Sequence, residues 1–411
     1  IYSAGIVVIS NCTFSGNKAA TYGALYGTAV IKNSIIWNNS PALISSGTRI
    51  NSIIEGGAPG AGNLNLSPQF IAQVSPSAAP TTSGDYHLQA CSPAINAGDN
   101  SFVPAGIGKD LDSVTRIKYT TVDMGAYETQ SIDLANSTWK GVNTDWNDKV
   151  NWCGGYIPYD TTNVIIPTGL ANYPVVGTGF TNGVKNMLLG NGSSLGISNT
   201  SQFTVFGTYT NNGSAISNNG TLTLAGNASG QSFPGVLGSV AAMNNLEINN
   251  PSGVVLNKSF SITGALMPTA GNINLDNDTI TLKSTRTGTA SVWQIGPLAS
   301  ISYTGTGKFE VQRFINTGTV AANGEHPKSW QFLSTPVSGL SIFQSWQESG
   351  TTPSGFGTII TGTGSGFDIT TALPSMKYYD EAAVNWKGVT NTSAALQNKL
   401  GYMLFVRGDR S

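Results

Sequence analysis

Charged residues are scarce in this 411-residue chain. Lys and Arg together number 20 and Asp and Glu 21, so charge makes up 10% of the sequence, whereas soluble domains usually carry about a quarter. The net charge of -1 supplies no field that would attract nucleic acid or an anionic membrane. No run of apolar residues approaches the roughly 18 that a membrane helix needs. We therefore expect neither a nucleic-acid partner nor a membrane-spanning segment.

Histidine and cysteine are also rare. The two histidines, His87 and His326, cannot form a multi-histidine metal site. The three cysteines, Cys12, Cys91 and Cys153, lie far apart and form no CxxC pair, which argues against a zinc site or a redox dithiol. An odd number leaves at least one thiol unpaired. We expect buried, free cysteines that pack as small hydrophobic residues, in preference to a disulfide.

The residues that are abundant indicate a β-rich protein. The chain has 50 Gly, 18 Pro and 38 Asn, which favour turns, together with 37 aromatic residues, enough for packed cores. The length fits two to four domains. Because the sequence opens in the middle of a pattern, we expect it to be a fragment of a longer protein.

An internal repeat near the start predicts a solenoid. The segments NCTFSGN, NSIIWNN and NSIIEGG begin at Asn11, Asn33 and Asn51, 22 and then 18 residues apart. In stacked turns, equivalent apolar residues form buried ladders, and Asn suits left-handed corners. Unrelated Asn-rich turns remain the alternative. Two apolar ladders are predicted: Ile9, Ile31 and Ile50, and Phe14, Ile36 and Ile54.

The first 70 or so residues, with runs such as CTFSGNKAATYGALYG, resemble right-handed parallel β-helix proteins of bacterial surfaces. The next segment is similar to the small domain called choice-of-anchor Q, through GDYHL from Gly84, SPAINAG from Ser92, KDLD from Lys109, Arg116 and DMGAYE from Asp123. Where that family commonly has Gly-Asn-Pro, this chain has Ser113, Val114 and Thr115, so a tight turn that depends on Gly is in doubt. These resemblances imply β-helix turns over residues 1–83 and a cap over 84–135.

Residues 136–308 begin with a Trp-rich segment that resembles one in surface proteins of Bacteroidota. Trp139, Trp146 and Trp152 fit a plug at the end of a β core, and exposed rings that stack on sugars are the alternative. Short alternating strands follow, among them FTVFGTYT from Phe203 and TLTLAG from Thr221. Residues 186–246 contain no charged side chain. We expect a second β-solenoid-like region here.

Residues 309–411 have longer and more charged strands, including FEVQRF from Phe309, SWQFLSTPV from Ser329 and GYMLFVRGDRS from Gly401. They resemble a domain that often precedes a type IX secretion sorting module in Bacteroidota. We expect a β-sandwich.

No catalytic set stands out. His87 and His326 are the only imidazole bases and both lie in unremarkable contexts, and GTGSGFD from Gly362 lacks the ending of a phosphate loop. In the first 70 residues Glu55 is the only acid, too few for glycoside hydrolysis by two carboxylates, and Lys18, Lys32 and Arg49 are the only cations. The carboxylates of Asp110, Asp112 and Asp123 fit either a calcium site or the capping of loops.

The sequence thus predicts an all-β chain: the C-terminal end of a right-handed parallel β-helix, a β-solenoid-like region and a β-sandwich. We assign no catalytic, cofactor-binding or metal-binding residue and no cofactor. The expected function is a secreted or cell-surface stalk or adhesin, with glycans, neighbouring cell surfaces or secretion machinery as partners and self-association through exposed β edges. The alternatives are an accessory portion of a polysaccharide-degrading β-helix enzyme, either a lyase or a glycoside hydrolase, and a carbohydrate-binding module.

Overall fold

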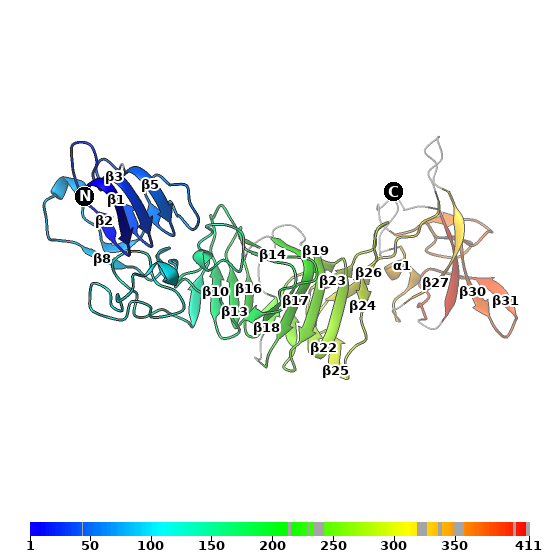
Figure 1. Cartoon of the computed structure of the whole chain (residues 1–411). Helices are drawn as coiled ribbons and strands as arrows, with labels where there is room; N and C mark the ends of the chain where they lie inside the picture. Colours follow the sequence, from blue (N-terminus) through cyan, green and yellow to red (C-terminus); the bar gives the residue numbers. More distant parts are fainter. Residues whose placement is uncertain are drawn as a thin grey trace. The chain divides into compact units, whose positions relative to one another are not determined.

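The computed structural model describes residues 1–42, 44–212, 215–227, 231–233, 242–318, 327–335, 339–347, 357–397 and 400–407. Helix accounts for 4% of the chain, and the rest of the regular structure is β. The chain forms two compact units, Ile1–Arg313 and Phe314–Ser411. The first contains a parallel β-solenoid of about 12 turns (Figure 1). The prediction of an all-β chain with a parallel solenoid is confirmed. The boundaries of the four predicted domains stay a prediction.

The first turns stack two parallel sheets. The longer strands form the sheet β1-β3-β5 and the shorter ones β2-β4-β6, and an Asn in left-handed conformation joins each pair, with φ of 52°, 46° and 45° at Asn11, Asn33 and Asn51. Phe14 pairs with Ile36 and Ile36 with Ile54, so that ladder is confirmed. The strands are β1 (Tyr2–Ser10), β2 (Thr13–Ser15), β3 (Leu25–Lys32), β4 (Ile35–Trp37), β5 (Ile44–Ile50) and β6 (Ile53–Ile54).

The other predicted ladder is wrong at its third position. Ile9 pairs with Ile31, but Ile31 pairs with Arg49, and Ile50 lies opposite Lys32. Ile9 and Ile31 each stand two residues before the corner Asn, whereas Ile50 stands one residue before it. A shift of one residue moves a side chain to the opposite face of a strand.

The segment after these turns covers the short strands from outside. Ile35 and Ile53 point away from the solenoid interior, yet they are buried in a cluster with Phe70, Ala94 and Met124. Gly125 lies so close that a Cβ would stand 2.8 Å from the Ile35 side chain. We call residues 84–135 the cap. The elements β7 (Phe70–Ala72) and η1 (Pro76–Ala78) precede the cap, and β8 (Asp85–Leu88) and η2 (Asn100–Phe102) lie within it.

The remainder of the first unit is a longer parallel stack. The predicted strands from Phe203 and Thr221 are confirmed as parallel strands, and further parallel strands follow them along the chain. Asn side chains bridge successive turns, from Asn186 to Asn163 at 2.7 Å and from Asn163 to Asn136 at 2.8 Å. The core is apolar and continuous from Trp139 to Ala290. A four-stranded sheet contains β9 (Asn136–Thr138), β10 (Asn163–Ile166), β13 (Asn186–Leu189) and β16 (Tyr209–Asn211), and η3 (Lys149–Asn151) precedes β10.

The second sheet of this stack is the largest in the protein and is also parallel. Its last strand, β26, pairs with β23. Its strands are β11 (Val175–Val176), β12 (Gly183–Val184), β14 (Ser194–Ile197), β15 (Gln202–Val205), β17 (Ala215–Ala225), β18 (Gln231–Phe233), β19 (Ala242–Asn249), β20 (Val254–Leu256), β21 (Phe260–Ile262), β22 (Ala265–Asn274), β23 (Thr279–Leu282), β24 (Ser291–Val292), β25 (Leu298–Ser302) and β26 (Lys308–Val311).

The second unit is built differently. Four antiparallel strands form a sheet in the order β27-β32-β30-β31, and one face packs on α1 and on the residues around β28. The glycine-rich turn after Gly362 joins β28 to β29. The elements are β27 (Ser329–Ser334), α1 (Ile342–Ser345), β28 (Thr361–Gly362), β29 (Ile369–Thr370), β30 (Met376–Asp380), β31 (Asn385–Gly388) and β32 (Gly401–Val406). Across the described ranges, no helix has the length and apolarity needed to cross a membrane.

Candidate functional site

The centre of the cap is a buried arginine. Arg116 is 2% exposed, and its guanidinium donates to three backbone carbonyls, of Ala126 at 2.9 Å, Asp123 at 3.1 Å and Gly125 at 2.6 Å. The DMGAYE segment therefore wraps around one side chain. The rigid fork of the guanidinium suits this arrangement because its two terminal nitrogens reach all three carbonyls from one side chain.

Two buried carboxylates accompany Arg116. Both oxygens of Asp123 accept backbone amides, from Asn96 at 2.7 Å and Thr129 at 2.7 Å. Glu128 lies 3.9 Å from Arg116, and burial together with the charge of Asp123 raises its pKa to about 8. Burial also raises the pKa of Asp123, and the hydrogen bonds that its carboxylate accepts from Asn96 and Thr129 oppose that rise.

The cap is bonded to the first solenoid turns. The side chain of Asn33 exchanges two hydrogen bonds with the backbone of Asp99, at 2.8 and 2.9 Å. The amide of Gly125 donates to the Asn33 carbonyl at 2.8 Å, and the amide of Ala126 donates to the Thr13 hydroxyl at 3.0 Å. One corner Asn of the repeat thus serves both the stacking of turns and the attachment of the cap.

A disulfide joins the cap to the second solenoid. Cys91 and Cys153 are bonded, which corrects the expectation of free cysteines, while Cys12 carries the free thiol. The amide of Gly154 donates to Ala90 at 3.2 Å, and Asn96 donates its side-chain amide to Gly154 at 3.0 Å. The folding of the intervening residues brings the two cysteines together, and their spacing in the sequence carries no sign of it.

Three tryptophans close the second solenoid at this junction. Trp139, Trp146 and Trp152 are 1%, 0% and 0% exposed, and Trp152 lies edge-on to both others with ring centroids 4.9 and 4.7 Å away. The plug prediction is confirmed. Sugar stacking on these rings is wrong, because buried rings present no face to a ligand. Beside them, burial lowers the pKa of Lys140 to about 8.

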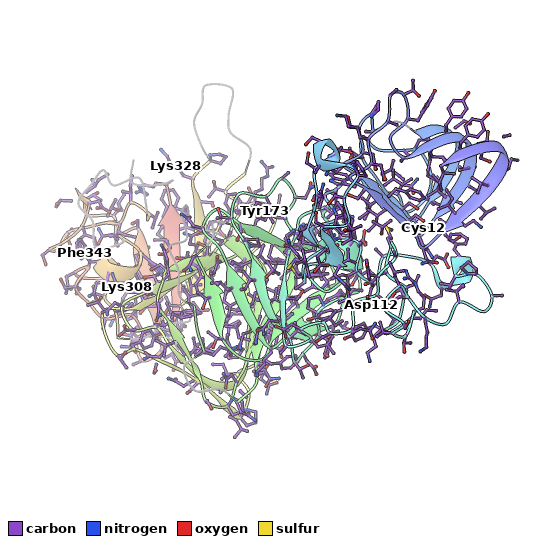
Figure 2. The ribbon with its side chains drawn as sticks, turned by 90° about the vertical axis from the view of Figure 1, so that its left-hand side faces the viewer. Cys12, Asp112, Tyr173, Lys308, Lys328 and Phe343 are labelled. Atoms are coloured by element: carbon purple, nitrogen blue, oxygen red, sulfur yellow. A yellow bond between two sulfur atoms is a disulfide. The ribbon has the colours of Figure 1, made fainter. Side chains whose placement is uncertain are left out.

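His87 fastens the outside of the cap. Its Nδ1 lies 2.5 Å from an Asp85 oxygen and its Nε2 2.5 Å from an Asp112 oxygen, and its ring is 4.1 Å from that of Tyr127. The hydrogen bond to Asp112 raises the pKa of His87. Both ring nitrogens are engaged by carboxylates, so neither accepts a proton from a nucleophile. Figure 2 labels Asp112 on its loop in the cap.

The loop from Asp110 to Thr115 forms the turn that was in doubt. Ser113 adopts φ of 64°, the left-handed conformation that Gly would take more easily. The Asp110 carboxylate accepts the amides of Asp112, Val114 and Glu128, at 2.9, 3.1 and 2.8 Å. Asp110, Asp112 and Asp123 therefore have separate partners, and in the described ranges no cluster of three or more His, Cys, Asp or Glu could hold a metal.

The remaining predicted candidates lie apart from one another. Glu55 accepts the amide of Asn38 at 2.7 Å, the ammonium of Lys32 stands over the Phe102 ring, and Arg49 donates to Gly47. Lys18 forms a bridge to the next turn. His326 lies outside the described residues. The structure does not bring these side chains together into one site.

What the residues of the cap build is a joint: a buried Arg116 centre, the Asn33 bonds to one solenoid and the disulfide to the other. The resemblance singled out Arg116 and DMGAYE, but the roles of Asn33, Asn96 and the two cysteines were missed. The SPAINAG motif was the available signal for Asn96. The chain matches no protein-family model, no curated protein and no solved structure.

Proposed function

We propose that the chain is part of an exported, non-enzymatic surface protein, a stalk or adhesin whose solenoid carries and displays other β modules. The observation that carries the proposal is the Cys91–Cys153 disulfide, because structural disulfides persist in oxidising compartments outside the cytosol. A covalent bond at the junction between the cap and the second solenoid suits a protein that must hold its modules together under mechanical force.

The sequence resemblances give the proposal its finer form. Similarity to the choice-of-anchor Q segment and to a domain that precedes type IX sorting modules supports export in a member of the Bacteroidota. The low charge and the stacked Asn and apolar ladders are typical of repeat scaffolds, in which each turn contacts only its neighbours.

The proposal is tested by locating the protein. Antibodies to the second unit, applied to intact producing cells and to their culture medium, should detect the chain, and protease added outside the cells should degrade it. Cells lacking the gene should adhere less to surfaces or to one another. Detection only after lysis would refute export, and unchanged adhesion would refute the adhesin form while leaving a stalk.

A further inference from the structure

The antiparallel sheet of the second unit has one face in the core and one face that carries aromatic residues. Met376, Tyr402 and Leu404 point into the core, so their neighbours along the strands point outward. Strand pairing places Trp330 opposite Phe405, and Tyr379 opposite Trp386. We call the outward residues the aromatic face: Trp330, Phe332, Lys377, Tyr379, Trp386, Met403, Phe405 and Arg407.

Three of these rings are exposed, and the ring of Trp386 lies against two of them. Phe332 is 73% exposed, Trp330 40% and Tyr379 39%. The ring centroid of Trp386 lies 5.7 Å from that of Phe332 and 5.5 Å from that of Tyr379. Aromatic residues in such numbers on one surface mark an interaction site more often than a solvated face.

The face also carries two cations. The Lys377 ammonium stands 5.1 Å from the Trp330 ring centroid, and the Arg407 guanidinium 4.6 Å from that of Phe405. The four strands contain a single acid, Asp380. Because it follows Tyr379 in β30, its side chain points to the opposite face of the sheet. There its carboxylate pairs with the ammonium of Lys387 at 2.5 Å. Among the described outward positions there is no Asp or Glu, so the face is positive.

We infer that the aromatic face binds an acidic polysaccharide, a chain of pyranose rings that carry carboxylates. The C–H faces of a pyranose ring pack on aromatic rings, whose faces carry partial negative charge. The carboxylates of the same chain pair with Lys377 and Arg407 through charge-assisted hydrogen bonds.

Two other occupants fit less well. Single-stranded nucleic acid carries a phosphate on every nucleotide and follows a track of cations, whereas this face offers two. The core of a protein interface is depleted in Lys, whereas Lys377 lies on β30, an inner strand of the sheet. A disulfide-bonded chain also meets polysaccharide in the compartment where its disulfide persists.

The inference deepens the adhesin form of the proposed function by naming a ligand class, and it rests on that function for its biological meaning. The inferred ligand and the proposed function can be refuted independently. Binding is measured on purified protein and does not depend on export, and export is measured on cells and does not depend on binding.

The test uses the full chain and polygalacturonate, with neutral dextran and poly(dT) as competing probes, by calorimetry at low salt. Three variants are compared with the wild type: Phe332→Ala, the double variant Lys377→Gln/Arg407→Gln, and Trp293→Ala as control. Trp293 is 60% exposed on the first unit and lies outside the aromatic face. Circular dichroism and size-exclusion chromatography of each variant check its fold and oligomeric state.

We expect polygalacturonate to bind and dextran and poly(dT) to bind at least tenfold more weakly. Phe332→Ala and the double variant each lower the affinity about tenfold, Trp293→Ala leaves it unchanged, and added salt weakens binding. Equal binding of dextran would overturn the acidic class, tighter binding of poly(dT) would indicate nucleic acid, and no binding of any probe would overturn the inference. Conversion of an oligomer to a monomer by Phe332→Ala, without loss of polysaccharide binding, would assign the face to self-association.

Discussion

Removal of the Cys91–Cys153 disulfide should loosen the joint between the cap and the second solenoid. The bond closes a loop with a sequence separation of 62 residues, and the loss of loop entropy in the unfolded chain for such a loop corresponds to about 4 kcal/mol of stability. The hydrogen bonds from Gly154 to Ala90 and from Asn96 to Gly154 remain in the folded reduced protein. We therefore expect a weakened joint and not an unfolded chain.

Hydrogen exchange measures this effect where it occurs. In the double variant Cys91→Ser/Cys153→Ser, amides of residues 90–98 and 136–155 should exchange up to about a thousandfold faster, the factor that about 4 kcal/mol gives when opening of the joint limits exchange. Strands such as β22 and β23, far along the solenoid, should keep their protection because repeats couple mainly to neighbours. Cys12→Ser is the matched control. Unchanged exchange around Gly154 in the double variant, or an equal effect of Cys12→Ser, would show that the disulfide does not stabilise the joint.

Two further substitutions and one titration test the cap. Arg116→Met removes the guanidinium donors to the Asp123 and Gly125 carbonyls and one of two donors to the Ala126 carbonyl. It also leaves the buried carboxylates without their cation, and it should destabilise the first unit by about 3–5 kcal/mol in urea unfolding. A loss below about 1 kcal/mol would contradict the central role of Arg116. The pKa of Glu128 is raised to about 8, so between about pH 5 and 8 the folded state binds more protons than the unfolded state. The free energy of unfolding should therefore fall as pH rises from about 5 to 8. Glu128→Gln should flatten this pH dependence, and an unaltered slope would contradict the role of Glu128. The raised pKa of His87 contributes stability that is present at low pH and is lost as pH rises through the folded-state pKa. NMR titration measures this pKa. A His87 resonance that titrates at the ordinary histidine pKa would contradict its pairing with Asp85 and Asp112.

The solenoid could be predicted because its determinants are local and repeated. Asn11, Asn33 and Asn51 mark corners at intervals that show in the sequence, and the residue three places after each Asn falls on one ladder. Ile50 shows the limit of this reasoning, since a change in turn length alters which residue faces the core. Ser113 shows another, because a neighbouring carboxylate supports a turn that sequence preference alone would assign to Gly.

The joint and the aromatic face depend on contacts that no spacing encodes. The pairing of Cys91 with Cys153 follows from the path of the intervening chain around Arg116. His87 gains its role from Asp112, which reaches it from a separate loop. In the second unit SWQFLS and GYMLFVRG could be predicted as strands, but which set of side chains faces outward follows only from the packing of Tyr402 and Leu404 in the core.

We propose that this chain is an exported scaffold held together at a disulfide-bonded joint. Mass spectrometry of the native protein, recovered from outside the producing cells and alkylated without reduction, examines both parts of this proposal. We expect a cross-linked peptide pair containing Cys91 and Cys153 and an alkylated Cys12. Recovery of all three cysteines as free thiols, or of the protein from the cytosol alone, would contradict it.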